Sequence, residues 1–115
     1  MDNNIVEEKS FHFAVRIVNL YKHLCNDKKE FTLSKQTLRS GTSIGANVAE
    51  AKQAQSRADF LSKLSIALKE TTETKYWLRL MNATGYLSTV EYESIMEDCV
   101  ELEKILVAIV KTIKN

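Results

Sequence analysis

Apolar residues recur at steps of three and four along most of the chain, and this spacing predicts amphipathic helices. The pattern is most regular between Tyr92 and Ile113, where it continues for about three heptads. It is interrupted by the charged segment 26–30, by Ser56–Asp59 and by the segment from Asn82 to Ser88. We therefore expect one domain over residues 1–115, with helices at about 5–25, 34–55, 57–84 and 89–114.

Residues typical of helix ends lie at these interruptions. Ser34 is expected to cap the second helix, and Ser56–Asp59 resembles a capping box at the start of the third. Ser88–Glu91 is a regular capping box for the fourth helix. Gly85 suits the end of the third helix, because glycine readily adopts the left-handed conformation found there.

One face of the second predicted helix consists mainly of small side chains. An interior glycine costs up to about 1 kcal/mol relative to alanine. Two of them, Gly41 and Gly45, therefore indicate that another helix approaches closely. The residues on this face are Thr37, Gly41, Ile44, Val48, Ala51 and Gln55.

Polar residues flank the small-residue face. Because buried polar groups need partners, we expect a hydrogen-bonded cluster that fixes helix register or a subunit contact, with Arg39 as a further candidate member. A solvated polar edge is the alternative. The expected cluster consists of Ser43, Asn47, Glu50 and, from the third helix, Glu73.

Composition supports long helices. The 115 residues include three glycines and no proline, whereas sheet proteins need frequent turns. We expect an all-α, antiparallel up-down four-helix bundle. The apolar surface is wider than one bundle needs, which favours a homo-oligomeric ring; a thick core with scattered surface hydrophobes is the alternative. The extra apolar positions on the fourth helix are Met96, Val100, Val107 and Val110.

Overall charge gives no reason to expect nucleic acid or an anionic membrane, because 16 basic and 15 acidic residues leave a formal charge of +1. Basic residues of the second and third helices are nevertheless candidate nucleic-acid contacts. They form no continuous stripe in one subunit, so they are either aligned across subunits or simply solvated. These candidates are Lys35, Arg39, Lys52, Arg57, Lys75 and Arg79.

No catalytic pattern is recognisable in the sequence. It contains no P-loop, nucleophile elbow or glycine-rich dinucleotide turn. His12 and His23 share a helix face but lack the Glu-x-x-His pairs of di-iron bundles. We therefore expect no enzyme, and no catalytic residue, cofactor, metal or small-molecule substrate. A metal-dependent enzyme is the least favoured alternative.

The remaining features favour a cytoplasmic protein. Cys25 and Cys99 are isolated and match no metal spacing, which is typical of buried thiols in a reducing compartment rather than of a disulfide. No apolar run is long enough for a membrane span, and the first ten residues are too polar for a secretory signal.

A further pattern is carried by seven segments of the second and third helices: Leu33–Gln36, Arg39–Val48, Glu50–Ala51, Phe60–Ala67, Lys69–Glu70, Glu73–Thr74 and Tyr76–Leu80. In these segments the chain resembles the bacterial 23S rRNA intervening-sequence proteins. The chain departs from many members in two places. They have proline in the first turn, where this chain has Asp27–Lys29, and glycine where this chain has Ala51. The resemblance implies four antiparallel helices, often assembled as a five-fold ring. A similar protein is an accessory subunit for the reverse transcriptase of diversity-generating retroelements, where a basic ring contacts nucleic acid.

From the residues and this resemblance we expect a non-enzymatic, oligomeric adaptor, with a homopentamer implied by the resemblance. Its partners would be RNA, DNA or a nucleic-acid enzyme such as a reverse transcriptase. The alternative is a protein-only scaffold in which the acidic fourth helix or the region of Trp77 docks a partner protein.

Overall fold

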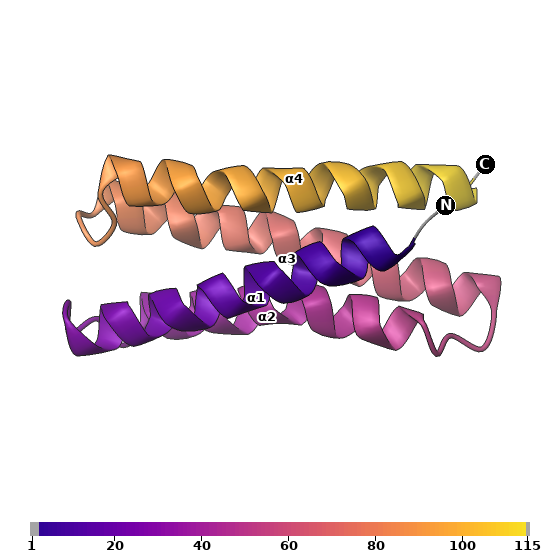
Figure 1. Ribbon diagram of the computed structural model, residues 1–115, viewed down its shortest axis with the longest axis horizontal. Coiled ribbons are helices and arrows are strands. Elements are labelled where there is room, and N and C mark those ends of the chain that lie inside the picture. Colours follow the sequence, from indigo (N-terminus) through magenta and orange to yellow (C-terminus); the bar gives the residue numbers. More distant parts are fainter. Residues whose placement is uncertain (1–2, 115) are drawn as a thin grey trace.

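Residues 3–114 are described by a computed structural model, and they form four long helices joined by short turns (Figure 1). Each helix packs antiparallel to the next, and α1 returns to contact α4, so the predicted four-helix bundle is confirmed. Its Cα atoms extend over 44 Å along the long axis. Within the described residues, no helix has the length and apolar character needed to cross a membrane. The helices are α1 (Asn3–Asn26), α2 (Leu33–Ala51), α3 (Arg57–Ala83) and α4 (Thr89–Lys114).

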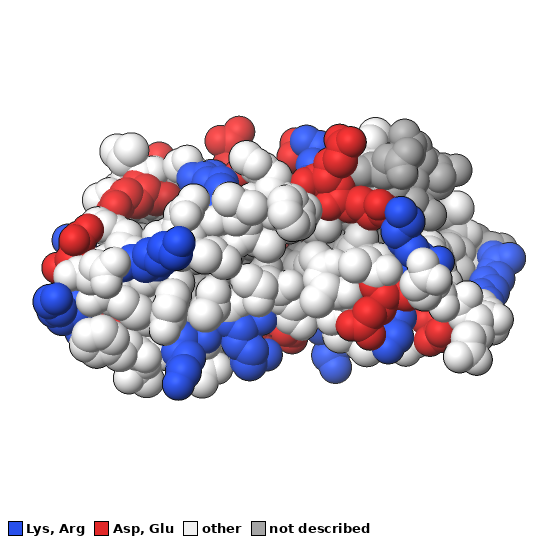
Figure 2. Space-filling view, turned by 60° about the horizontal axis from the view of Figure 1, so that its bottom comes forward, with Lys and Arg blue, Asp and Glu red and all other residues white. Residues whose placement is uncertain are grey.

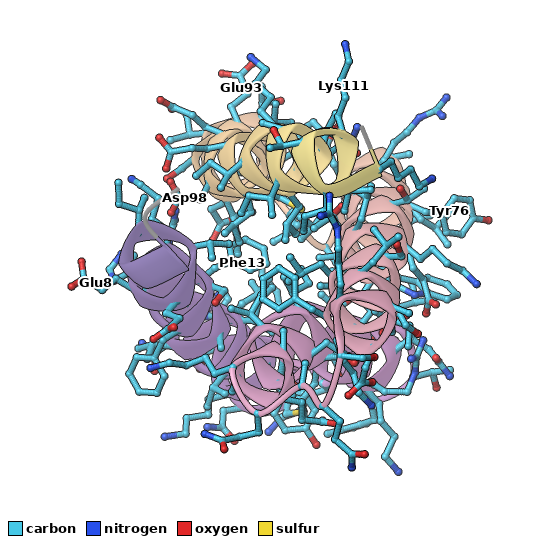
Figure 3. The ribbon with its side chains drawn as sticks, turned by 90° about the vertical axis from the view of Figure 1, so that its right-hand side faces the viewer. Glu8, Phe13, Tyr76, Glu93, Asp98 and Lys111 are labelled. Carbon is cyan, nitrogen blue, oxygen red and sulfur yellow. The ribbon has the colours of Figure 1, made fainter. Side chains whose placement is uncertain are left out.

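The core lies where the apolar faces of all four helices meet. Phe13 points from α1 into this space (Figure 3) and is 1% exposed. On α4, the predicted positions from Ile95 to Ile109 are buried as the heptad spacing requires. On α3, Thr71 and Thr74 lie within the core, where their hydroxyl groups donate to carbonyl oxygens of their own helix.

Two of the predicted helix starts and one helix end are confirmed in atomic detail. The Ser56 hydroxyl accepts from the backbone N–H of Asp59, 3.0 Å away. Ser88 and Glu91 exchange backbone-to-side-chain bonds of 2.8 and 3.1 Å, as a capping box requires. Gly85 follows α3 with a φ of +88°.

The end of α2 differs from the prediction. The helix stops at Ala51 and not at Gln55, and the backbone N–H of Gln53 and Ala54 close the final turn. The sequence has no glycine or proline at this point to mark the helix end. A prediction from apolar spacing alone therefore makes the helix roughly one turn too long.

The start of α2 is capped by Glu30 and not, as predicted, by Ser34. The Glu30 carboxylate accepts from the backbone N–H groups of Thr32, Leu33 and Ser34 at 2.7–3.0 Å. Ser34 lies inside the helix, and its hydroxyl donates to the Glu30 carbonyl oxygen. Burial raises the pKa of the Glu30 carboxyl, but the backbone hydrogen bonds lower it more, so the pKa lies below its ordinary value.

The two interior glycines mark the closest approach of α1 to α2. A methyl group at Gly41 would lie 2.7 Å from Cγ1 of Ile17, and one at Gly45 would lie 3.2 Å from the backbone oxygen of Ser10. Ile17 is β-branched and 1% exposed, so it cannot move aside without disturbing the core. The expected close helix contact is therefore present, and α1 is the helix that makes it.

We expect Gly41→Ala to destabilise the fold by about 1–3 kcal/mol, because overpacking exceeds the gain in helix propensity. Chemical denaturation measures this change. In an Ile17→Ala background the clashing atoms are gone, and Gly41→Ala should be neutral or stabilising. Equal costs in both backgrounds would contradict the packing explanation.

Glu30→Gln should cost about 1 kcal/mol at neutral pH through the weakened cap. A carboxyl whose folded pKa is depressed stabilises the fold above its unfolded pKa, and this contribution disappears as the pH falls through the folded pKa. The difference between wild type and variant should therefore shrink below the ordinary value of 4.5. Denaturation curves across pH 2–7 test this, with Glu93→Gln as an exposed control that should show no such trend.

Candidate functional site

An open apolar groove lies between the outer faces of α1 and α2. Its volume is about 430 Å³, and its α2 side is lined by Gly45, Ala46 and Ala49. Figure 2 shows this side of the molecule, where uncharged residues, drawn in white, make up much of the surface. Phe11 of α1 lines the groove with 72% of its surface exposed. A phenyl ring so exposed beside small side chains leaves room for a further apolar group.

The apolar surface continues from the groove along α1. Val15 and Val18 follow Phe11 at steps of four and three, and both are exposed. Near the other end, Lys52 Nζ lies 3.0 Å from Glu7 Oε2. The second carboxylate oxygen of Glu7 is buried without a hydrogen-bond partner among the described residues. The groove is thus apolar along its length, with an ion pair at one end.

A second polar arrangement joins α2 to α3. The Arg39 guanidinium forms ion pairs with Glu70, at 3.3 Å, and with Glu73. Glu73 also accepts from the indole N–H of Trp77 at 2.9 Å. The Tyr76 ring packs edge-on against Trp77 with centroids 5.1 Å apart. These contacts fix an exposed arginine and two aromatic rings in one orientation.

The structure does not bring the four residues of the predicted polar cluster together. The Asn47 amide donates to the carbonyl and hydroxyl oxygens of Ser43 one turn earlier, at 2.9 and 3.2 Å. Glu50 is exposed and lies 3.3 Å from Lys63. Glu73 lies level with Arg39 and not with Asn47, because the register of the antiparallel helices pairs it there.

The buried polar contact between these two helices involves other residues. Ser40 and Thr74 are both fully buried, and their hydroxyl oxygens lie 2.9 Å apart. Helical spacing in the sequence places both residues on the core-facing sides of their helices. This contact could have been predicted from that placement, because a small polar residue in a core needs a partner.

Four of the six candidate nucleic-acid residues, namely Arg39, Lys52, Arg57 and Lys75, form contacts within the chain. Arg39 is held by the glutamates described above, and Lys52 by Glu7. The Arg57 guanidinium donates to the backbone carbonyl of Ile113 at 2.6 Å.

The remaining members of this set differ in their surroundings. Lys75 Nζ lies 3.1 Å from Glu103 at the α3–α4 interface. Lys35 and Arg79 are exposed, and no carboxylate among residues 3–114 forms an ion pair with them. Four of the six side chains therefore lie at three different helix interfaces, and the role of the whole set as nucleic-acid contacts stays a prediction.

The interface of α1 with α4 is largely ionic at its surface. Arg16 binds Asp98 at 2.8 Å and the Ser94 hydroxyl at 2.9 Å. Lys9 and Glu101 form a further pair at 2.9 Å. Asp98 lies between the two helices in Figure 3. The pairs use charges from the sides of the helices and leave their outer faces available.

The thiol groups are separate from each other. Cys25 is half-buried and Cys99 is buried, and both are free. Burial raises the pKa of the Cys99 thiol to about 12, so it stays protonated at neutral pH. Over residues 3–114, no group of three or more His, Cys, Asp or Glu side chains is arranged to hold a metal ion.

Comparisons with known proteins identify relatives of this chain. No curated protein matches it. A solved structure from Bacteroides thetaiotaomicron, described as a protein of unknown function from the S23 ribosomal protein family, is 61% identical. The match covers 96% of this chain and 99% of that one, with a TM-score of 0.95. The model of the family described as 23S rRNA-intervening sequence protein matches residues 2–108. The chain belongs to the 23S rRNA-intervening sequence protein family.

Proposed function

We propose that this protein is a non-enzymatic adaptor that assembles with copies of itself and presents the assembly to a macromolecular partner. The observation that carries the proposal is the apolar groove between α1 and α2, with Phe11 exposed along it. Exposed apolar patches rimmed by charge are typical of protein contact surfaces. A homopentamer is the assembly that we expect from the family resemblance.

The composition of the groove suits contact with a helix. Gly45, Ala46 and Ala49 provide a low surface that lets another backbone approach, and Phe11 provides a large ring to bury. An aromatic side chain near the centre of such a surface contributes more to binding than its neighbours. The groove therefore supports association with a protein surface better than binding of a polar small molecule.

Replacing Phe11 should dissociate the assembly without unfolding the subunit, because its ring is exposed in the monomer. We expect Phe11→Glu to behave as a monomer of 13.1 kDa in gel filtration with light scattering, at concentrations where wild type is larger. Phe31→Glu is the matched control, since Phe31 is 59% exposed and lies outside the groove. Equal behaviour of the two variants would contradict the role of the groove.

A second candidate function is nucleic-acid binding by the assembly. The observation in its favour is that Lys35 and Arg79 are exposed and have no carboxylate partner among residues 3–114. Their charges are available to phosphate groups, whereas those of Lys52 and Lys75 are bound by glutamates. The partner would be RNA, DNA or an enzyme that acts on them; the protein-only scaffold is the competing case.

Salt-dependent binding to a single-stranded RNA 20-mer tests this function. Each phosphate contact contributes about −0.7 to the slope of log affinity against log salt. Lys35→Gln combined with Arg79→Gln should therefore make the slope shallower by about 1.4. Lys52→Gln combined with Lys75→Gln is the matched control and should change it less. No binding near 50 mM salt, or equal losses in both pairs, would favour the protein-only scaffold.

A further inference from the structure

We propose that the outer face of α1 binds the outer face of α4 of a second copy, with the two helices antiparallel and the two bundles pointing the same way. This proposal rests on the self-association proposed above, and it names the surface that covers α1 in the assembly. It follows from two rows of residues that have the same spacing and that each carry an acidic residue at one end and a basic residue at the other.

The first row lies along the outside of α1. Its members, at successive steps of three, four, three and four, share one helix face because these steps follow the helical repeat. The row begins with an acid and ends with a base, and its three middle side chains are exposed and apolar. Glu8 projects away from the bundle in Figure 3. The row consists of Glu8, Phe11, Val15, Val18 and Lys22.

The second row lies along the outside of α4 and repeats these steps. It also begins with an acid and ends with a base, and Val107 within it is 46% exposed. Lys111 projects away from the bundle in Figure 3, as does Glu93 one turn before the row. The row consists of Glu97, Val100, Lys104, Val107 and Lys111.

Charges at the ends of both rows are available to a neighbour. The ionic contacts of α1 with α4 inside one chain use residues outside the rows: Lys9 with Glu101, Arg16 with Asp98, and His23 with Glu91 at 3.7 Å. Among the described residues, the charged members of the two rows form no ion pair. The α1 row therefore has an apolar centre, and the α4 row has a valine on each side of Lys104; both rows have unpaired charges at their ends.

The two rows match when they are antiparallel. Each row covers 15 residues, so its first and last members lie about 21 Å apart along the helix axis. In this alignment Glu8 faces Lys111, and Lys22 faces Glu97. Phe11 and Val18 then meet Val107 and Val100, while the alkyl part of Lys104 covers Val15. Every position in one row has a compatible partner in the other.

The opposite orientation is disfavoured by charge. A parallel alignment of the rows would place Glu8 beside Glu97 and Lys22 beside Lys111, which is repulsive at both ends. Within one bundle α1 and α4 are antiparallel (Figure 1). An antiparallel contact between copies therefore keeps the long axes of all bundles pointing in the same direction.

Contact between two copies of α1 satisfies fewer groups. An antiparallel α1–α1 pairing also matches Glu8 with Lys22, but it leaves Val100 and Val107 of both copies in water. Pairing α1 with α4 covers both rows. Because the two surfaces differ, the contact is heterologous and each copy can bind two neighbours, which gives a closed ring or an open filament.

Mixing two complementary variants tests the pairing. Phe11→Glu disables the α1 row, and Val107→Glu disables the α4 row; both residues are exposed, so both variants should fold. Each variant alone should be a monomer, because the row that its intact row would bind is disabled in every copy. An equimolar mixture should form a dimer of two chain masses in light scattering, since each variant retains one intact row.

Charge reversal supplies a second readout. Lys22→Glu and Glu97→Lys should each weaken assembly about fivefold, and the two changes in one chain should restore it, because the pair is re-formed with reversed signs. Lys28→Glu is the matched control at the same end of the molecule and outside both rows; it should not be rescued by Glu97→Lys.

The outcomes separate the two proposals. A mixture that stays monomeric, or a double charge reversal no better than the single ones, would overturn the α1–α4 pairing. If Val107→Glu assembles like wild type while Phe11→Glu does not, α1–α1 pairing replaces it and the role of the groove stands. If wild type is monomeric at every concentration, self-association itself is refuted.

Discussion

Close contact between α1 and α2 is the constraint on which the other features depend. Gly41 leaves just enough space for Ile17, and Gly45 allows the backbone of Ser10 to approach. Van der Waals contacts at such short range are sensitive to small displacements, so these residues fix how far apart the two helices lie. The rotation of α1 is fixed as well, because Phe13 must then point into the core.

Fixing that rotation has a consequence for the surface. With Phe13 inward, Phe11 necessarily points outward, since two residues along a helix differ by about 200°. The side of α2 next to it carries mainly small residues, among them Gly45, Ala46 and Ala49, which cannot cover a phenyl ring. The same glycine and alanine positions that allow tight packing inside the subunit therefore leave an uncovered apolar ring outside it. The core and the groove have one cause.

How much of this was predictable depends on the range of each interaction. The buried positions and the close contact at Gly41 follow from spacing along one helix, which the sequence displays directly. The partners of Glu73 do not, because they depend on the register between two helices. A shift of about two turns decides whether Arg39 or Asn47 lies level with it. The cap of α2 was missed because Glu30 lies in the turn, outside any helical pattern.

The distribution of charge follows from the same packing. Ionic groups at the sides of the helices, such as Arg16 and Asp98, can reach across an interface and are paired within the chain. Charges on the outer faces, such as Glu8 and Lys111, point away from every other helix. Exposed ion pairs contribute little free energy, so such charges set the orientation of a contact, while the apolar side chains between them provide its affinity. A nearly neutral chain can thus favour one orientation of a contact over the other. The orientation depends on the order of the charges along the contacting helix face and not on the net charge of the chain.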